Sequence, residues 1–375
     1  MFVDFKYLLV GVKQRNMKED LNKEQELIQI LKMVAPGTEL REGLENILKA
    51  RTGALIVISD SPDVMKLADG GFKIDEEYSP AKIYELAKMD GALVLSKDAK
   101  RILLANTQLV PDSSIVTEET GTRHRSGERV AKQTNELVIS ISQRRNLITI
   151  YKGDIKYVLQ DSSKVLTKAN QALQTVEKYK NIFDDAIHTL NEFEFDDIVT
   201  LENVVKTLQR AELCMRVVAE VNRYIIELGE DGRLVEMQLA ELSKDVESEE
   251  KLLVKDYVFD NQKEIEALLK ISALSHRDLS DKMVVARVLG YTTEGSLDDV
   301  EISPRGYRIL NKIPKTPMNI IDNILKAFGS FQHVIRATTE ELDDVEGIGE
   351  VRAKNIRQSI KRMHEQAIYD SKFYR

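Results

Sequence analysis

The stretch Gly53-Ala54-Leu55-Ile56-Val57-Ile58 contains no charged or strongly polar side chain. A β-strand points successive side chains to opposite faces, so a run that is apolar throughout predicts a strand buried on both faces. Strands of this kind lie in sheets that helices cover on both sides. The stretch therefore predicts an α/β domain in this part of the chain.

The segments on both sides of this strand alternate between helical and strand patterns. Apolar residues at helical spacing predict two helices within residues 21–51, separated by Pro36-Gly37. Ser79-Pro80 predicts the start of another helix, because the serine hydroxyl can cap it and proline suits the first helical position. Four further apolar runs predict the other strands of the sheet: residues 90–95, 102–105, 138–142 and 147–151.

From about Lys156 onward the apolar residues are three or four positions apart, and no strand pattern is found. This spacing over residues 165–190 and 201–218 predicts long helices. The hypothesis for the residues before Met17 is a dispensable extension. The prediction is a multidomain protein: an N-terminal extension (1–16), an α/β domain with a helix-covered mixed sheet (17–155), an all-α helical spine (156–303) and a small all-α domain (304–375).

The acidic charge of the chain is concentrated in its middle. The whole chain carries 54 basic and 62 acidic residues, a net charge of −8. Residues 154–300 hold 18 basic and 30 acidic residues, whereas residues 301–375 hold 13 and 10. A basic C-terminal part suits contact with nucleic acid, while the acidic helical surface is more typical of a solvated face.

Cysteine usage and hydropathy indicate the compartment. The single cysteine, Cys214, excludes an intramolecular disulfide and a cysteine-rich metal site, and it suits a reducing cytosol. It lies in a helical apolar pattern, which is typical of a buried, inert thiol. No apolar run approaches the roughly 20 residues that a membrane-spanning helix needs. We therefore expect a cytoplasmic protein without a membrane partner.

The C-terminal domain contains a Gly-Ile-Gly hairpin between two short helical segments, a pattern typical of a helix-hairpin-helix. Glycines let the hairpin backbone approach a DNA phosphate, and the N–H groups that open the second helix point toward it. Such contacts to the DNA backbone carry no sequence information. The alternative is a tight turn between packed helices. The predicted DNA-binding residues are Gly347, Ile348, Gly349, Arg352 and Lys354.

The stretch Thr120–Arg129 has the composition of a loop that binds polyphosphate. Arg123, His124 and Arg125 can carry positive charge, and arginine forks fit phosphate oxygens in pairs. The hydroxyls and glycines around them add short hydrogen bonds and let a ligand approach the backbone. Taken by itself, the stretch is equally compatible with a solvated charged loop, so it needs a partner elsewhere in the chain.

Asp90 is the candidate partner, because phosphoryl chemistry needs a divalent cation such as Mg²⁺ or Mn²⁺. It stands at the start of a predicted buried strand, and Gly91-Ala92 leave room for a nucleotide. A carboxylate there can hold the cation and favour deprotonation of an attacking hydroxyl. Asp-Gly alone is also typical of a helix-to-strand turn.

Together these motifs closely resemble the diadenylate cyclase (DAC) family. The resemblance rests on Asp90-Gly91-Ala92, on Gly121-Thr122-Arg123-His124-Arg125, and on Ser142-Gln143-Arg144-Arg145. The helical middle and the terminal helix-hairpin-helix match the domain order of the DNA-integrity scanning members of that family. The resemblance covers nearly all of the chain after Met17.

The resemblance implies that two ATP are condensed into cyclic di-AMP with release of two pyrophosphates. It implies that Asp90 binds the metal and is catalytic together with Arg123, His124 and Arg125, which would grip phosphates. Ser126 stands where threonine is expected and keeps the hydroxyl. The implied nucleotide-binding residues are Asp90, Gly91, Ala92, Leu109, Thr122, Arg123, His124, Arg125, Ser126 and Ser142. Members of the family form octamers, so a homo-octamer associated with the bacterial nucleoid is expected.

The sequence is compatible with two functions from different classes. The first is a diadenylate cyclase, with ATP as substrate and cyclic di-AMP as product, that branched or damaged DNA regulates. The second is a non-enzymatic DNA-structure binding protein with an ATP-sensing domain. The presence of Asp90 argues against the second, because a sensor does not need a metal-binding acid. A repair nuclease or glycosylase lacks support, since no acidic cluster or catalytic lysine accompanies the hairpin.

Overall fold

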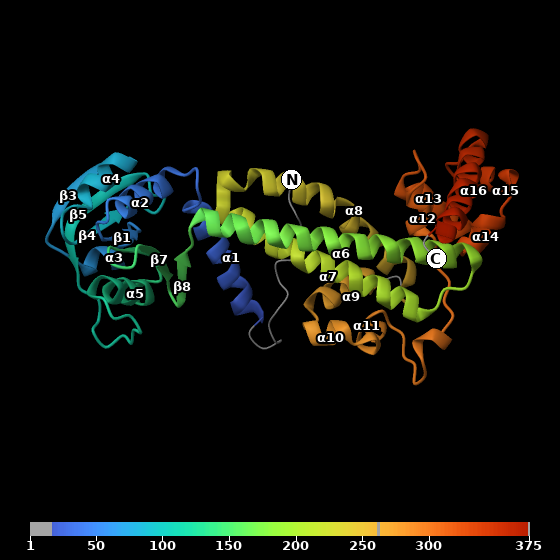
Figure 1. The fold of residues 1–375 in the computed structure, drawn as a ribbon, viewed down its shortest axis with the longest axis horizontal. Coiled ribbons are helices and arrows are strands. Elements are labelled where there is room, and N and C mark those ends of the chain that lie inside the picture. Colours follow the sequence, from blue (N-terminus) through green and yellow to red (C-terminus); the bar gives the residue numbers. More distant parts are fainter. Residues whose placement is uncertain (1–16, 261–262, 374–375) are drawn as a thin grey trace. The chain divides into compact units, whose positions relative to one another are not determined.

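The computed structural model describes residues 17–260 and 263–373, so the expected N-terminal extension lies outside the described residues. Two compact units make up the described chain. One comprises Lys18–Ala169 and Arg223–Leu234, and the other comprises Asn170–Asn222 and Val235–Arg375. The first unit contains the sheet, and the second is helical (Figure 1).

The first unit is built on an eight-stranded mixed sheet with the order β2-β5-β4-β1-β6-β7-β8, in which β3 pairs with β5. The strand in the quoted stretch, β1 (Ala54–Ile58), lies inside the sheet and is buried at all five residues. It runs parallel to β4 (Ala92–Leu95) and antiparallel to β6 (Leu137–Ser142). The predicted helix-covered mixed sheet is confirmed.

Helices pack against both faces of this sheet (Figure 1). On one face, α1 (Met17–Met33), α2 (Glu39–Lys49) and α4 (Pro80–Leu86) share an apolar core with alternate residues of β1 and β6. On the other face, α3 (Pro62–Leu67) and α5 (Thr122–Thr134) pack on the remaining residues of the same strands. Both faces of β1 are therefore removed from water, which is why every one of its positions is apolar.

Three strands were not predicted by the sequence pattern: β2 (Ala68–Asp69), β3 (Phe72–Glu77) and β8 (Ile155–Leu159). β3 is mostly exposed and β8 is only partly buried, so neither has the apolar run of a central strand. They are held by the hydrogen bonds of their partner strands, β5 (Arg101–Leu109) and β7 (Leu147–Lys152). The expectation that no strand follows Lys156 is therefore wrong, because β8 continues the sheet to Leu159.

Long helices follow the sheet, as the apolar spacing predicts: α6 (Ser162–Asp196), α7 (Leu201–Leu228) and α8 (Arg233–Tyr257). A 3-10 turn at Gly229–Gly232 separates α7 from α8. Cys214 on α7 is buried, and burial raises the pKa of its thiol to about 12, which agrees with an inert side chain. No helix in the described ranges is long and apolar enough to cross a membrane.

Short helices complete the second unit: α9 (Glu264–Ala273), α10 (His276–Ser280), α11 (Lys282–Val288), α12 (Tyr307–Asn311), α13 (Met318–Phe328), α14 (Phe331–Arg336) and α15 (Thr339–Asp343). The last helix, α16 (Glu350–Phe373), is longer. Helices α12 to α16 share an apolar core that includes Phe331, Leu342 and Ile356. The small all-α C-terminal domain is thus confirmed as a helical fold.

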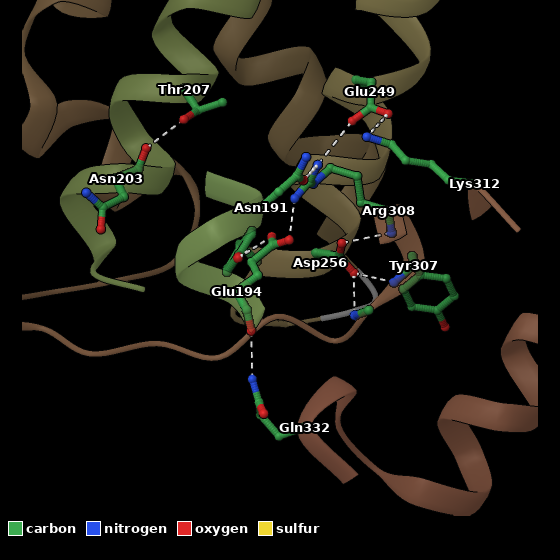
Figure 2. A network of polar contacts seen from close by, with 12 residues as sticks. Asn191, Glu194, Asn203, Thr207, Glu249, Asp256, Tyr307, Arg308, Lys312 and Gln332 are labelled. Carbon is green, nitrogen blue, oxygen red and sulfur yellow. Dashed lines mark hydrogen bonds and ion pairs between the residues drawn. The ribbon is translucent and has the colours of Figure 1, made fainter. Parts of the chain in front are cut away.

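A buried ionic network surrounds Arg308 on α12 (Figure 2). The side chains of Arg308 and Glu194 are both 0% exposed and form an ion pair with each other. Glu249 on α8 pairs with Arg308 at 3.4 Å and with Lys312 at 3.1 Å. The Tyr257 hydroxyl donates to Glu194 at 2.6 Å. Charged groups from α6, α8 and α12 therefore compensate one another out of water.

Asp256 near the end of α8 binds the start of α12 (Figure 2). Its carboxylate oxygens accept backbone N–H groups of Gly306 at 2.8 Å, Tyr307 at 2.6 Å and Arg308 at 2.9 Å. Burial and the charge of Glu194 raise the pKa of Asp256 to about 7, although the N–H donors oppose this rise. The same carboxylate thus fixes the start of α12 against the end of α8.

Candidate active site

The stretch Thr120–Arg129 is part of a helix, so the expectation of a loop is wrong. Helix α5 begins at Thr122, with Gly121 as its N-cap. The buried apolar side chains of the helix, Val130 and Ala131, come two turns after its start. The basic first turn therefore has no apolar residues at helical spacing that would predict a helix. The first N–H groups of a helix lack intrahelical acceptors and favour anions. A role in binding polyphosphate therefore suits this helix N-terminus.

A cavity of about 770 Å³ lies where the start of α5 adjoins the beginning of β4 and the end of β5. These strand ends are neighbours, since Ala92 pairs with Thr107 in an antiparallel register. The volume falls in the range of roughly 300–1,000 Å³ that is usual for small-molecule sites. Six of the predicted nucleotide-binding residues line it: Gly91, Ala92, Leu109, Thr122, Arg123 and Ser126.

Two glycines let the backbone segments around this cavity approach one another. A Cβ atom on Gly91 would lie 2.8 Å from the carbonyl carbon of Asn106, and Gly91 has a φ of +88°. A Cβ atom on Gly71 would lie 2.7 Å from the carbonyl oxygen of Ala105, and its φ is +81°. Larger residues at either position would have to displace β5, which supplies one wall of the cavity.

The other predicted site residues lie outside the cavity lining. Asp90 is exposed and directly precedes Gly91 in the lining. Arg125 is also exposed, on the first turn of α5. Ser142 ends β6, and its hydroxyl accepts a backbone N–H from the following turn at 3.2 Å. His124 is half-buried and has its own contacts beside the cavity.

The guanidinium group of Arg123 lies over Gly53, the first residue of the quoted stretch. A Cβ atom on Gly53 would be 2.0 Å from Nη1 of Arg123 and 3.2 Å from the carbonyl oxygen of Ile141. Glycine at this position therefore leaves the space that Arg123 occupies next to the start of β1. The sequence pattern offered no reason for a glycine here, because the contact joins segments about 70 residues apart.

His124 belongs to a chain of polar side chains. Its Nδ1 lies 3.0 Å from the Tyr151 hydroxyl, and that hydroxyl donates to Oε1 of Glu119 at 2.9 Å. Lys156 pairs with the same Glu119 oxygen at 2.6 Å. Neither Tyr151 nor Glu119 was predicted, because Tyr151 belongs to an apolar strand pattern and Glu119 precedes the basic stretch without a pattern of its own.

Further residues of the cavity lining were not predicted from the sequence: Leu55, Asp69, Gly70, Gly71, Asn106, Thr107 and Gln108. The Gly70-Gly71 pair was a usable signal, because paired glycines mark close backbone approach. Asn106 could not be recognised from the sequence as a lining residue. Its backbone has a φ of +53°, a conformation that is seen only in the folded strand. Asp69 adds a second exposed carboxylate to the rim.

The metal expected at Asp90 would have few protein ligands. Among the residues that the structure describes, no group of three or more His, Cys, Asp or Glu side chains is placed to hold a metal ion. Mg²⁺ in nucleotide sites is usually bound by one or two carboxylates together with substrate phosphates. A single exposed carboxylate beside a nucleotide-sized cavity fits that donor set.

The predicted helix-hairpin-helix consists of α15, a glycine hairpin and α16. Gly347 has a φ of +83°, and Arg352 donates to its carbonyl oxygen, so Arg352 supports the hairpin itself. Ile348 is buried against the domain core. No atom lies within 4 Å of a Cβ atom placed on Gly349, so this side of the hairpin is open. Lys354 is exposed and pairs with an acidic residue one turn earlier.

Two family models match the chain. One, described as DisA bacterial checkpoint controller nucleotide-binding, matches residues 41–155, and the other, described as DisA bacterial checkpoint controller linker region, matches residues 159–297. A solved structure of DacA from Staphylococcus aureus is similar at 20% identity and a TM-score of 0.27, covering 37% of this chain and 90% of that chain.

Curated relatives match at nearly full length, and two of them illustrate the match. The DNA integrity scanning protein DisA of Clostridium botulinum (strain Loch Maree / Type A3) is 54% identical over 350 residues, 93% of this chain and 99% of that protein. The protein of the same name from Acetivibrio thermocellus is 54% identical over 354 residues, 94% of this chain and 98% of that protein. The chain belongs to the DisA family of diadenylate cyclases.

Proposed function

We propose that the protein condenses two ATP into cyclic di-AMP and two pyrophosphates, and that branched or damaged DNA bound by its C-terminal domain regulates this synthesis. The observation that carries the first part is the cavity at the start of α5. It joins Gly91 and Ala92 to Thr122, Arg123 and Ser126, which lie about 30 residues further along the chain. Family membership supports the same reaction.

The chemistry of the lining residues supports a separate role for each segment in nucleotide binding. The apolar side chain of Leu109 and the small residues Gly91 and Ala92 suit the adenine and the ribose. Thr122, Arg123 and Ser126 suit the phosphates, since hydroxyl and guanidinium groups donate to phosphate oxygens. The N-terminus of α5 adds favourable N–H groups for the same anion.

In each half of the reaction, the 3′-oxygen of one ATP forms a bond to the α-phosphorus of the other ATP. The 3′-hydroxyl gives up its proton, and the bond from the α-phosphorus to the pyrophosphate oxygen breaks, so that pyrophosphate leaves with the electron pair. Positioning and charge neutralisation supply most of the rate enhancement in such transfers. Arg123 and Arg125 would neutralise the departing charge.

Asp90 would hold a divalent cation, Mg²⁺ or Mn²⁺, which lowers the pKa of an attacking hydroxyl. The product is two-fold symmetric, so two facing copies of the domain, each with one ATP, would supply both attacks. A homo-oligomer, expected to be an octamer, is therefore part of the proposal. DNA binding through the C-terminal domain would associate the protein with the nucleoid.

The cyclase activity is tested by incubating the protein with ATP and Mn²⁺ or Mg²⁺ and detecting cyclic di-AMP by chromatography. Asp90→Asn is expected to reduce synthesis roughly 100-fold or more, since it removes a charge that acts at the reacting groups. Asp63→Asn is the matched control, because Asp63 is an exposed acid of the same unit that pairs with the exposed Lys66. Equal synthesis by Asp90→Asn and wild type would refute the assignment.

The DNA site is tested best at Gly349. Gly347 is a poor target, because its positive φ and a Cβ atom 2.7 Å from Ile320 would disturb the hairpin fold. Gly349→Val adds bulk on the open side, so it should weaken branched-DNA binding while leaving synthesis without DNA unchanged. Lys354→Gln should also weaken binding. Lys270→Gln is its control, since Lys270 has the same exposed fraction, 58%, and the same i,i+4 ion pair on another helix.

The alternative function is a DNA-structure binding protein whose nucleotide domain senses ATP without a reaction. It predicts ATP binding, DNA binding and no cyclic di-AMP. The family assignment and the carboxylate of Asp90 beside the cavity favour the enzyme. The chromatography assay separates the two functions directly, because only the enzyme produces cyclic di-AMP.

A further inference from the structure

The hydrogen bonds around His124 determine which of its ring nitrogens carries a proton. Glu119 is ionised, because its contacts with Lys156 and Tyr151 lower the pKa of its carboxyl against the effect of burial. An ionised carboxylate only accepts, so the Tyr151 hydroxyl donates its hydrogen to Glu119. The oxygen of Tyr151 is then left as an acceptor, and Nδ1 of His124 must donate to it. The neutral imidazole therefore has its hydrogen on Nδ1.

This arrangement is held rigidly from several directions. Tyr151 is 1% exposed, and burial together with Glu119 raises the pKa of its hydroxyl, which stays protonated. The segment that carries Glu119 is tied to α5, because Thr117 donates to the buried carboxylate of Glu128. Thr117 in turn accepts the backbone N–H of Glu119 at 3.1 Å. Arg129 of α5 donates to the carbonyl oxygen of the same segment at residue 115.

The second ring nitrogen, Nε2, is buried and has no hydrogen-bond partner within the described residues. With the hydrogen on Nδ1, Nε2 carries a lone pair and can only accept. Phosphate oxygens at neutral pH also accept, so they cannot satisfy this atom. A hydrogen-bond donor or a cation can. Resting on the function proposed above, we propose that Glu119 and Tyr151 are positioning residues that hold His124 in its Nδ1–H form, so that the lone pair of Nε2 stays available as an acceptor when ATP and its divalent cation are bound.

The charges that face His124 favour its neutral form. Burial lowers the pKa of His124, Glu119 opposes this, and Arg145, Lys156 and Arg123 lower it further. These groups come from α5 itself, from the segment before it, from the β6–β7 turn and from β8, and Tyr151 of β7 is uncharged. Synthesis that depends on the neutral ring is present above this lowered pKa and is lost as the pH falls through it, below the usual value of about 6.5. A phosphate clamp that needed the charged ring would instead lose activity as the pH rises.

The direct test is the tautomer of His124, read from the imidazole ¹⁵N shifts of the full-length protein labelled at histidine. The His124 signals are assigned by their loss in His124→Gln. Wild type should show hydrogen on Nδ1, whereas Tyr151→Phe and Glu119→Gln should show a shift toward hydrogen on Nε2. Tyr78→Phe is the matched control, because Tyr78 is a buried tyrosine of the same unit whose hydroxyl donates elsewhere, to the carbonyl oxygen of Glu39. It should leave the tautomer unchanged.

The kinetic test uses the same variants with ATP. Tyr151→Phe and Glu119→Gln should lower kcat about 10-fold with little change in KM, since they disturb positioning rather than phosphate binding. A wild-type enzyme with hydrogen on Nε2, or a tautomer that is the same in wild type, Tyr151→Phe and Glu119→Gln, would overturn the inference. So would activity that declines as the pH rises through the titration of His124. If wild type made no cyclic di-AMP, the proposed function would fail, while the ¹⁵N measurement would still decide the tautomer.

Discussion

Arg308 and His124 are both enclosed by the protein, and they differ in how their hydrogen-bonding groups are used. Both terminal nitrogens of Arg308 are bonded to protein oxygens, although its Nε has no partner among the described residues, and its carboxylate partner is itself bonded to Tyr257. His124 uses one ring nitrogen for Tyr151 and leaves the other without a partner in the described chain. The Arg308 network therefore joins charged groups of three helices, whereas the His124 chain orients a single ring beside the cavity.

The comparison implies that removing a charge has its largest effect at the Arg308 network. Arg308→Met should destabilise the second unit by about 3–5 kcal/mol, because it leaves Glu194 buried without its counter-charge. Denaturant unfolding followed by hydrogen exchange in residues 305–345 would measure the loss. Arg101→Met is the control, since the exposed Arg101–Asp75 pair contributes only about 0–1 kcal/mol. Similar losses in both variants would contradict the role assigned to the network.

The next largest effect is expected at Gly53 in the cyclase site. Gly53→Ala should displace the guanidinium of Arg123 and lower kcat/KM roughly 10- to 100-fold, because small misplacements of binding groups are costly. The measurement is kcat/KM of Gly53→Ala, of Arg123→Gln and of the double variant, which together form a double-mutant cycle. If Gly53 acts through Arg123, the double variant loses little more than Arg123→Gln alone. Additive losses would show that Gly53 acts independently.

A smaller effect is expected from pH at Asp256. Its folded pKa of about 7 lies above the ordinary value, so its contribution to stability is present at low pH and is lost as the pH rises through 7. Between pH 6 and pH 8 the second unit should lose on the order of 1 kcal/mol. Thermal unfolding at both pH values measures this difference. Asp256→Asn should remove it, and an unchanged pH dependence in that variant would assign the effect to another group.

The smallest effect is expected where the support of the His124 chain is indirect. Thr117→Val removes the hydroxyl that links Glu119 to Glu128, so the segment before α5 should become looser. We expect kcat to fall about 2- to 5-fold, which corresponds to part of a hydrogen bond. Ser163→Ala is a control that removes an exposed hydroxyl that donates to Asp161. A loss as large as that of Tyr151→Phe would mean that Thr117 has a more direct role.

Local patterns were sufficient where burial alone sets the residue types. The apolar run at β1 and the helical spacing of α6 and α7 predicted those elements, since each position there faces a core. Edge strands such as β3 escaped prediction, because hydrogen bonds to a neighbouring strand, not apolar burial, hold them in place. The first turn of α5 was not predicted to be helical for a related reason. Its side chains face the site and not the apolar core.

The sequence by itself determined the fold class and the motifs Asp90-Gly91-Ala92 and Thr122–Arg125, because these depend on residues adjacent in the chain. Only the tertiary structure decided that Gly53 makes room for Arg123, and that Glu119 and Tyr151 orient His124. Those contacts join residues that are distant in sequence, and a single one of them leaves no periodic pattern. Their geometry arises from strand register and from the close packing of α5 on the sheet.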